Sequence, residues 1–233
     1  MRSVVALTAL VLLATASASA AEDQNWSSDK EKQLLALLRS DTPASEKAIA
    51  CKQLAIYGSS AAVGDLAKLL PDPQLSSWTR IALEAIPGEE ASSALREATD
   101  SLEGNLLVGT INSIGVRRDA DAVPLLATRL QDKDPEVASA AAVALGRIGN
   151  AAATESLRKA LAGTPFNVRS AVAEGCVLCA ERMHAEGNSA EAVEIYDIIR
   201  NAELPKQRIL EATRGAILAR GQAGIPLLVE LFG

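Results

Sequence analysis

Residues 132–149 read DKDPEVASAAAVALGRIG, and this stretch decides the fold. Asp134 stands directly before Pro135; proline suits the first position of a helix, and an aspartate before it can cap the free N–H groups. Apolar residues then recur three and four apart, which is the period of an α-helix. Gly149 follows, and glycine tolerates the left-handed conformation that closes many helices. The stretch therefore predicts a helix from Pro135 that ends at Gly149 in a turn.

The same pattern, a proline that starts a helix and a glycine that ends it, recurs along the chain. A proline, preceded in most cases by a capping residue, stands at steps of 30, 62, 30 and 40 residues: Thr42-Pro43, Asp72-Pro73, Asp134-Pro135, Thr164-Pro165 and Leu204-Pro205. A glycine follows each apolar stretch: Gly58, Gly88, Gly115, Gly149, Gly187 and Gly221. Each unit is thus predicted to be a helix, a glycine turn and a second helix. Because one such pair cannot bury its apolar face alone, neighbouring units must stack.

Composition favours the same architecture. Aromatic residues make up only 3% of the 233 residues, and the apolar residues are mainly alanine and leucine, the best helix formers. We expect an all-α protein with a repeat array over residues 43–233. The third unit lacks an opening proline and uses Gly104-Asn105 instead. Residues 22–42 are expected to be a linker and a capping helix, with Ser28 to Arg39 as a short amphipathic helix over the open end of the stack.

Residues 132–149 resemble a HEAT repeat, in the short form also called PBS-lyase-like, and Phe166-Asn167-Val168-Arg169-Ser170-Ala171 opens the next unit in the same style. The resemblance implies a right-handed α-solenoid of about six HEAT-like helix pairs. The fifth unit is longer than the others. Its stretch from Gly187 to Tyr196 is similar to a tetratricopeptide unit, so the solenoid is expected to be a hybrid at that point.

The first 20 residues have the pattern of a signal peptide. Met1-Arg2 supplies a positive charge, an uncharged apolar run extends from Val4 to Leu13, and Ala18-Ser19-Ala20 fits the small-x-small rule for cleavage. Cleavage one residue later, after Ala21, fits equally well. The run is too short to span a membrane comfortably, and no other stretch is long enough. We therefore expect an exported chain, periplasmic or secreted, without a membrane span after cleavage.

Charge and motifs exclude several classes of function. Asp and Glu number 29 against 23 Lys and Arg, and an acidic chain without a basic stripe repels phosphate backbones, so nucleic acid is not an expected partner. HEAT-like arrays include bilin lyases and an iron-dependent protein hydroxylase that carries His-Glu ligand pairs. Here His184 is the only histidine and is followed by Ala185, so that site is absent. The chain is therefore predicted not to be an enzyme.

One group of residues could still carry chemistry: Cys176, Cys179 and His184. A redox pair belongs at a helix N-terminus, where the dipole lowers a thiol pKa, but Cys176 is predicted to lie well inside its helix. Residues three apart in a helix hold their Cβ atoms about 5–6 Å apart, against about 3.8 Å in a disulfide. Three ligands are also one short of a closed zinc site. Burial as small residues is the favoured interpretation, as for Cys51; a metal-binding or thiol-redox accessory role stays the alternative. No cofactor is expected.

The resemblance implies that the second helix of each unit lies on the concave, binding side. Polar candidates for protein binding there are Asp65, Lys68, Arg96, Arg129, Glu155, Arg158, Glu194 and Asp197. Trp78 and Tyr196 are large enough to anchor a partner, although core packing is the commoner role for such side chains.

We expect an exported protein–protein interaction scaffold, with the regulatory subunit of an exported enzyme as a further alternative. The last unit ends at Leu231-Phe232-Gly233 without a polar closing helix. Terminal repeats usually need a polar outer face, so we expect the C-terminal repeat to meet a partner or a second copy of the chain.

Overall fold

The computed structural model describes residues 28–232, and within that range the chain is built of helices without a strand. The predicted signal peptide, residues 1–20, lies outside the described residues. The first helix covers residues 28–39, as predicted for the capping helix. It buries Leu34, Leu35 and Leu38 on one face, which is the amphipathic pattern of a helix that covers the end of a stack.

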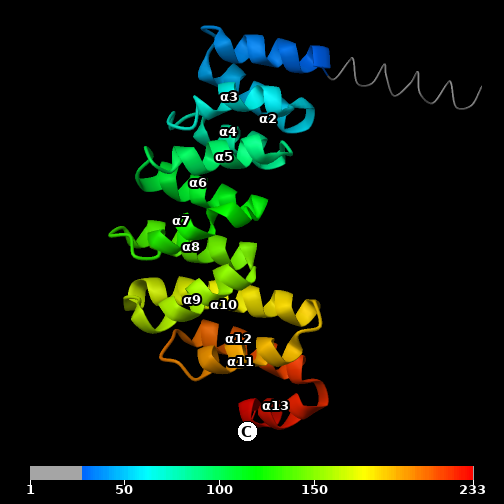
Figure 1. Cartoon of the computed structure of the whole chain (residues 1–233), viewed down its shortest axis with the longest axis vertical. Coiled ribbons are helices and arrows are strands. Elements are labelled where there is room, and N and C mark those ends of the chain that lie inside the picture. Colours follow the sequence, from blue (N-terminus) through cyan, green and yellow to red (C-terminus); the bar gives the residue numbers. More distant parts are fainter. Residues whose placement is uncertain (1–27, 233) are drawn as a thin grey trace, which may run out of the picture. The chain divides into compact units, whose positions relative to one another are not determined.

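Six helix pairs follow the capping helix in the described part of the chain, as the repeat period predicted (Figure 1). Their bounds are α2 (Ala44–Tyr57), α3 (Ser60–Ala67), α4 (Ser76–Ala85), α5 (Glu89–Ala98), α6 (Gly104–Arg117), α7 (Val123–Arg129), α8 (Pro135–Ile148), α9 (Ala151–Gly163), α10 (Phe166–Ala185), α11 (Ser189–Arg200), α12 (Lys206–Arg220) and α13 (Ile225–Phe232). Short 3-10 turns, η1 (Ala120–Ala122) and η2 (Gly221–Gly224), lead into α7 and α13.

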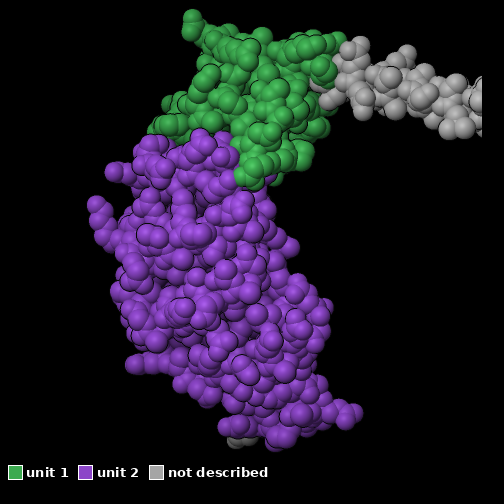
Figure 2. Space-filling model, viewed as in Figure 1, with its two compact units in different colours: residues 1–91 green, residues 92–233 purple. Residues whose placement is uncertain are grey.

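The chain forms two compact units, residues 1–91 and residues 92–233 (Figure 2). In the first unit, α2 and α3 both pack against α4, and Leu54 and Leu83 are fully buried. In the second unit the first helices pack side by side, α6 on α8 and α8 on α10. The predicted all-α solenoid of helix pairs is confirmed. No helix in the described part is long and apolar enough to cross a membrane.

The start and end of α8 follow from the stretch that decided the fold. Pro135 occupies the first turn, and the Asp134 carboxylate accepts a hydrogen bond of 2.9 Å from the Glu136 backbone N–H. Gly149 closes the helix in the left-handed region, with φ of 60°, where a residue without a Cβ is not strained. Between these ends the alanines and Leu145 are buried, so neighbouring helices can approach α8 closely on several sides.

The residues predicted to start and end the helices differ from the observed ones in two details. Gly115 does not close its helix but lies inside α6, which ends at Arg118 in the left-handed region, with φ of 54°. The second concerns the capping side chain expected before most prolines: Asp134 caps α8, and Asp72 accepts from the Gln74 N–H at 2.8 Å ahead of α4, but Thr42 and Thr164 do not cap α2 and α10. Pro43, Pro165 and Pro205 themselves occupy the N-cap position of α2, α10 and α12, without a side-chain cap.

Small residues let the first helices of the second unit touch through their backbones. A Cβ atom placed on Gly146 of α8 would lie 2.5 Å from the Gly175 Cα of α10, and one on Gly175 would lie 2.5 Å from the Ala142 carbonyl oxygen. Gly115 plays the same part between α6 and α8, where a Cβ would lie 2.8 Å from the Ala144 Cα. This close packing explains why Gly115 stands inside a helix.

The fifth unit departs from the simple pairing, as its length predicted. Its first helix, α10, has 20 residues, against 14 in α8. Its second helix, α11, packs against both α10 and α12, and it buries Tyr196 and Ile199 there. The side chains of α10, α11 and α12 therefore meet at one place, where a pocket of about 190 Å³ opens.

Candidate protein-interaction surface

A groove crosses the first helices of three consecutive units in residues 92–233. It has a volume of about 550 Å³; we call it the first-helix groove. Its floor consists of small and apolar side chains, and its rim is polar: Val108 and Asn112 from α6; Pro135, Glu136, Ser139, Ala140 and Val143 from α8; Asn167, Ala171 and Glu174 from α10. Because equivalent residues of successive units line it, an extended segment of another protein would meet the same kind of surface at each step.

The C-terminal ends of the same three helices form a second, positively charged hollow of about 520 Å³. Arg118, Arg147 and Arg182 line it together with Glu181 and Glu186. The Arg182 guanidinium donates to the carbonyl oxygens of Ile148 and Arg147, at 2.6 and 2.8 Å, which fixes it at the end of α8. Arg118 and Arg147 are exposed, so their charges face solvent beside the last turns of α6 and α8.

Four of the eight predicted binding residues, Asp65, Arg96, Arg129 and Asp197, are partly buried and held in contacts within the chain. Asp65 bonds to Arg39 at 2.6 Å and to Lys68 at 3.2 Å, and the hydrogen bond from Arg39 holds the pKa of the Asp65 carboxyl below its usual value. Arg96 pairs with Asp119, whose side chain is 4% exposed. These contacts join neighbouring elements, so the side chains stabilise the array.

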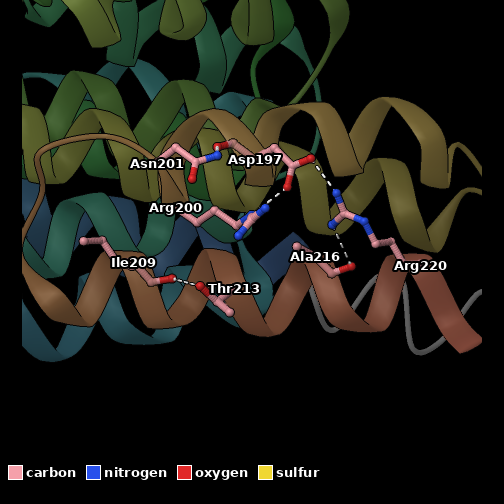
Figure 3. A network of polar contacts seen from close by, with 7 residues as sticks. All are labelled: Asp197, Arg200, Asn201, Ile209, Thr213, Ala216 and Arg220. Atoms are coloured by element: carbon pink, nitrogen blue, oxygen red, sulfur yellow. Dashed lines mark hydrogen bonds and ion pairs between the residues drawn. The ribbon is translucent and has the colours of Figure 1, made fainter. Parts of the chain in front are cut away.

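Arg129 and Asp197 are also held in contacts within the chain. Arg129 pairs with Asp132 at 2.9 Å and donates to the Thr99 carbonyl oxygen at 3.0 Å. Figure 3 shows Asp197 of α11 between Arg200 of its own helix and Arg220 of α12. Burial alone would raise the pKa of the Asp197 carboxyl, but the hydrogen bonds from Arg200 and Arg220 outweigh it and hold the pKa below its usual value.

The remaining predicted binding residues lie on exposed helix faces. The exposed side chains of Lys68 and Glu155 pair with Asp65 and Lys159, each three or four residues away. Arg158 and Glu194 are exposed on α9 and α11. Exposed pairs of this kind contribute little to stability, so these positions are accessible to a partner on the second-helix side, and their role in binding stays a prediction.

The structure buries Cys176 and Cys179 inside α10, whereas His184 lies exposed near the end of the same helix. Cys176 and Cys179 are 1% and 0% exposed, and the Cys179 sulfur lies 4.0 Å from the Gly146 carbonyl oxygen of α8. Burial, with Cys179 beside it, raises the pKa of the Cys176 thiol to about 12, and burial also raises the pKa of Cys179. His184 is exposed and its Nδ1 lies 2.9 Å from the Ser189 hydroxyl. No group of three or more His, Cys, Asp or Glu side chains in the described residues is placed to hold a metal ion.

The two aromatic candidates behave differently. Tyr196 is 2% exposed and belongs to the core, as predicted, but Trp78 is 38% exposed on α4, so its predicted core role is wrong.

Two features of the surface were not predicted. The first-helix groove depends on small residues such as Ala140 and Ala171, whose helical spacing is the same as that of core positions. The close helix contacts that shape it come from Gly146 and Gly175.

The chain is similar to one described family and to several solved structures. Residues 103–176 match the family described as HEAT repeats. The chain is similar in structure to human deoxyhypusine hydroxylase in complex with glycerol, with a TM-score of 0.50, 21% identity, and coverage of 73% of this chain and 67% of that one. It is also similar to an engineered protein with a TM-score of 0.47, 21% identity and coverage of 84% and 97%. A designed armadillo repeat protein has a TM-score of 0.42, 18% identity and coverage of 81% and 99%. No curated protein matches the chain in sequence. HEAT repeats are thus matched over residues 103–176, and the described part of the chain is an all-α solenoid of helix pairs.

Proposed function

We propose that the chain is an exported, non-catalytic scaffold that binds a protein partner along the first-helix groove. The observation that carries the proposal is the continuity of that groove over α6, α8 and α10. A surface built from equivalent positions of stacked repeats binds through many modest contacts spread along the array. The groove has an apolar floor and a polar rim, which is the composition of protein interfaces.

Two further parts of the proposal rest on other features. Export is supported by the leader pattern of residues 1–20, with its cleavage motif Ala18-Ser19-Ala20; the proposed compartment is the periplasm or the exterior. Self-association is supported by α13, where Ile225, Leu228 and Val229 are 56, 40 and 65% exposed. A partner that covers these side chains would remove apolar surface from water.

The test is capture of the partner by the chain from Glu22, immobilised in an extract of its own source, with two matched variants. Val143 is half-buried on the groove floor and Ile198 is 44% exposed on the second helix α11. Val143→Glu places a charge in the groove and is expected to reduce capture at least tenfold, because an interface core rejects an unpaired charge. Ile198→Glu is expected to leave capture unchanged.

Three outcomes contradict the proposal. Absence of a stoichiometric protein partner overturns the scaffold function. Loss of capture by Ile198→Glu with full capture by Val143→Glu moves the interface to the second helices. Loss of capture by the double change Cys176→Ala and Cys179→Ala, with bound metal in the parent protein and a folded variant, replaces the scaffold by a metal or thiol function.

A further inference from the structure

The positively charged hollow of about 520 Å³ lies beside the first-helix groove, at the C-terminal ends of α6, α8 and α10. Arg147 of the hollow comes four residues after Val143 of the groove on α8, and Leu178 comes four residues after Glu174 on α10. Residues four apart lie on the same face of a helix. A partner segment that leaves the groove in the direction of these helices therefore enters the hollow.

Two arginines of the hollow have no counter-ion in the described part of the chain. Arg118 and Arg147 are exposed, and neither side chain makes an ion pair or a hydrogen bond with residues 28–232. The Arg118 N–H donates to the Gly115 carbonyl oxygen at 3.1 Å, and the Arg147 Cδ lies 3.4 Å from the point where a Gly115 Cβ would stand. Both arginines thus reach the end of α6, where an anion between them would relieve the repulsion of like charges.

The ends of the helices do not account for these two charges. A cation near a helix C-terminus is favoured by the partial negative charge of the last carbonyl groups. At α8, however, the Arg182 guanidinium already donates to the carbonyl oxygens of Arg147 and Ile148. At α6 the backbone N–H of Arg118 closes the helix, which any residue except proline can do. The guanidiniums of Arg118 and Arg147 are therefore left for a ligand.

The backbone of Arg118 is a second, independent indication of a binding site. Arg118 is left-handed with φ of 54°, whereas the five other described residues of positive φ are glycines. A residue with a Cβ is strained in this region and glycine is not. Strained residues cluster at binding and active sites. The guanidinium is the feature that distinguishes this helix end from those closed by glycine.

The carboxylates near the hollow lie on its other side or are already paired. Glu181 and Glu186 belong to the C-terminal end of α10, whereas Arg118 and Arg147 stand at the ends of α6 and α8. Asp119, the neighbour of Arg118 in the chain, forms an ion pair with an arginine of α5. An anion between Arg118 and Arg147 would therefore stand away from the two glutamates.

The lining as a whole carries one unit of positive charge, because three guanidiniums face two carboxylates. This balance matches a carboxylate, which carries a single negative charge. A phosphate group carries about −1.5 to −2 at pH 7, and both glutamates would repel it more strongly. The half-buried Leu178 also lines the hollow and suits the methylene stem of an acidic side chain.

We propose that the positively charged hollow binds a glutamate or aspartate side chain of the protein partner, held between the guanidiniums of Arg118 and Arg147. The inference rests on the proposed function, since it names one anchor of the segment that the first-helix groove receives. The chain as a whole is acidic, with 29 Asp and Glu against 23 Lys and Arg, so it repels acidic segments elsewhere. The hollow would therefore fix where along the groove the acidic residue of the partner lies.

The test uses amino-acid probes without any partner. Nα-acetyl-glutamate amide is titrated at low salt into the untagged chain from Glu22, and Nα-acetyl-glutamine amide is the neutral probe of the same shape. The Nε–Hε signals of Arg118 and Arg147 in a heteronuclear NMR spectrum at mildly acidic pH report binding. The glutamate probe is expected to bind at least about fivefold more tightly than the glutamine probe. This preference is expected to fade at high salt, which screens exposed charges.

Variants then assign the contacts. Arg118→Gly removes one guanidinium and the strain together, so it is expected to abolish the preference for glutamate and to raise the urea midpoint of unfolding. Arg147→Gln removes the other guanidinium and is also expected to abolish the preference. Arg158→Gln removes an exposed arginine of α9 that does not line the hollow and is expected to leave the preference intact.

Three results overturn the proposal. The first is equal binding of the glutamate and glutamine probes by the parent chain. The second is an unchanged preference for glutamate in folded Arg118→Gly or Arg147→Gln. The third is tighter binding of inorganic phosphate than of the glutamate probe at the same two arginines, which would contradict the assignment to a carboxylate.

The result separates this inference from the scaffold function. A preference for glutamate without capture of a protein partner retains the anion site and overturns the scaffold. Capture of a partner that is sensitive to Val143→Glu, without any preference for glutamate, retains the scaffold and overturns the anion site.

Discussion

At the level of single residues, the three cysteines are packing residues. Cys51, Cys176 and Cys179 are free and buried, and Cys51 lies 3.8 Å from the Thr79 hydroxyl between α2 and α4. Burial raises the pKa of all three thiols. The thiolate is the reactive form, so buried thiols of raised pKa are protected both by access and by protonation.

This protection predicts slow thiol chemistry in the native protein. A thiol-specific disulfide reagent at neutral pH is expected to modify the folded chain at a rate at least about tenfold below that in guanidinium, where all three thiols become reactive. The measurement is the absorbance of the released thiolate over time. Two thiols that react at once in the native state would restore the redox interpretation of Cys176 and Cys179.

Asp197 links stability to pH. Burial opposes ionisation of its carboxyl, but Arg200 and Arg220 outweigh burial and lower its pKa in the folded chain, whereas an unfolded aspartate has a pKa of about 3.9. A carboxyl with a depressed folded pKa contributes stability that is fully present above the unfolded pKa and is lost as pH falls through the folded pKa. The ion pairs at Asp197 should therefore stabilise the protein at pH 7 and cease to do so in acid.

The prediction is checked with Asp197→Asn. The variant is expected to have a lower free energy of unfolding in urea than the parent chain at pH 7, and the difference is expected to shrink as the pH is lowered below about 4. A difference that stays constant over this range would mean that the carboxylate charge contributes nothing and that the side chain acts by shape alone.

At the level of elements, the contact between α8 and α10 depends on two glycines. Gly146→Ala and Gly175→Ala each force a Cβ to within 2.5 Å of the facing backbone, and overpacking of this kind costs about 1–3 kcal/mol. Gly64, inside α3, has no atom of another residue within 4 Å of the point where an added Cβ would lie. Gly64→Ala should instead raise the free energy of unfolding by about 0.5–1 kcal/mol, the usual gain from replacing a helical glycine.

Denaturant unfolding of the three variants side by side measures these effects. The informative result is that the free energy of unfolding falls for Gly146→Ala and Gly175→Ala and rises for Gly64→Ala, because all three changes add the same methyl group and differ only in its surroundings. If Gly146→Ala and Gly175→Ala were as stable as Gly64→Ala, the backbones of α8 and α10 would not approach each other as described.

The features that could be predicted from the sequence are those that depend on residues close together in the chain. Helix pairs were predictable because proline, glycine and apolar spacing act within a few residues, as at Pro135 and Gly149. The sequence does not distinguish a glycine that closes a helix from one that admits a neighbouring helix, so Gly115 was misassigned. Arg129 and Asp197 looked like surface charges because the Thr99 carbonyl and Arg220, which also hold them, lie far away in the sequence. The groove escaped prediction for the same reason: its floor combines residues from three units.

At the level of the whole molecule, the exposed apolar side chains of α13 bear on the oligomeric state. Burying Ile225, Leu228 and Val229 against a second copy would stabilise a dimer by roughly 25 cal/mol for each Å² of apolar area removed from water. The side chains of Leu231 and Phe232, and Gly233 itself, lie outside the described part of the structure. The expected self-association is therefore argued from α13 alone.

Light scattering over a range of concentrations tests it. The chain from Glu22 is expected to show a mass that rises above that of one copy as concentration increases, and Val229→Glu is expected to remain at the mass of one copy. A parent chain that stays monomeric at the highest soluble concentration would show that α13 does not join copies of the chain.

Three arginine contacts between helix pairs of the second compact unit run backward along the chain, whereas Arg96 donates forward to Asp119. Arg129 donates to the Thr99 carbonyl, Arg182 to the Ile148 carbonyl and Arg220 to the Asp197 carboxylate. In each case the donor comes later in the chain than the acceptor. Synthesis proceeds from the N-terminus, so these three acceptors leave the ribosome before the arginines that donate to them from later helices. During synthesis these three contacts would therefore form in order from the N-terminus, each one only after the later helix that supplies its arginine has emerged.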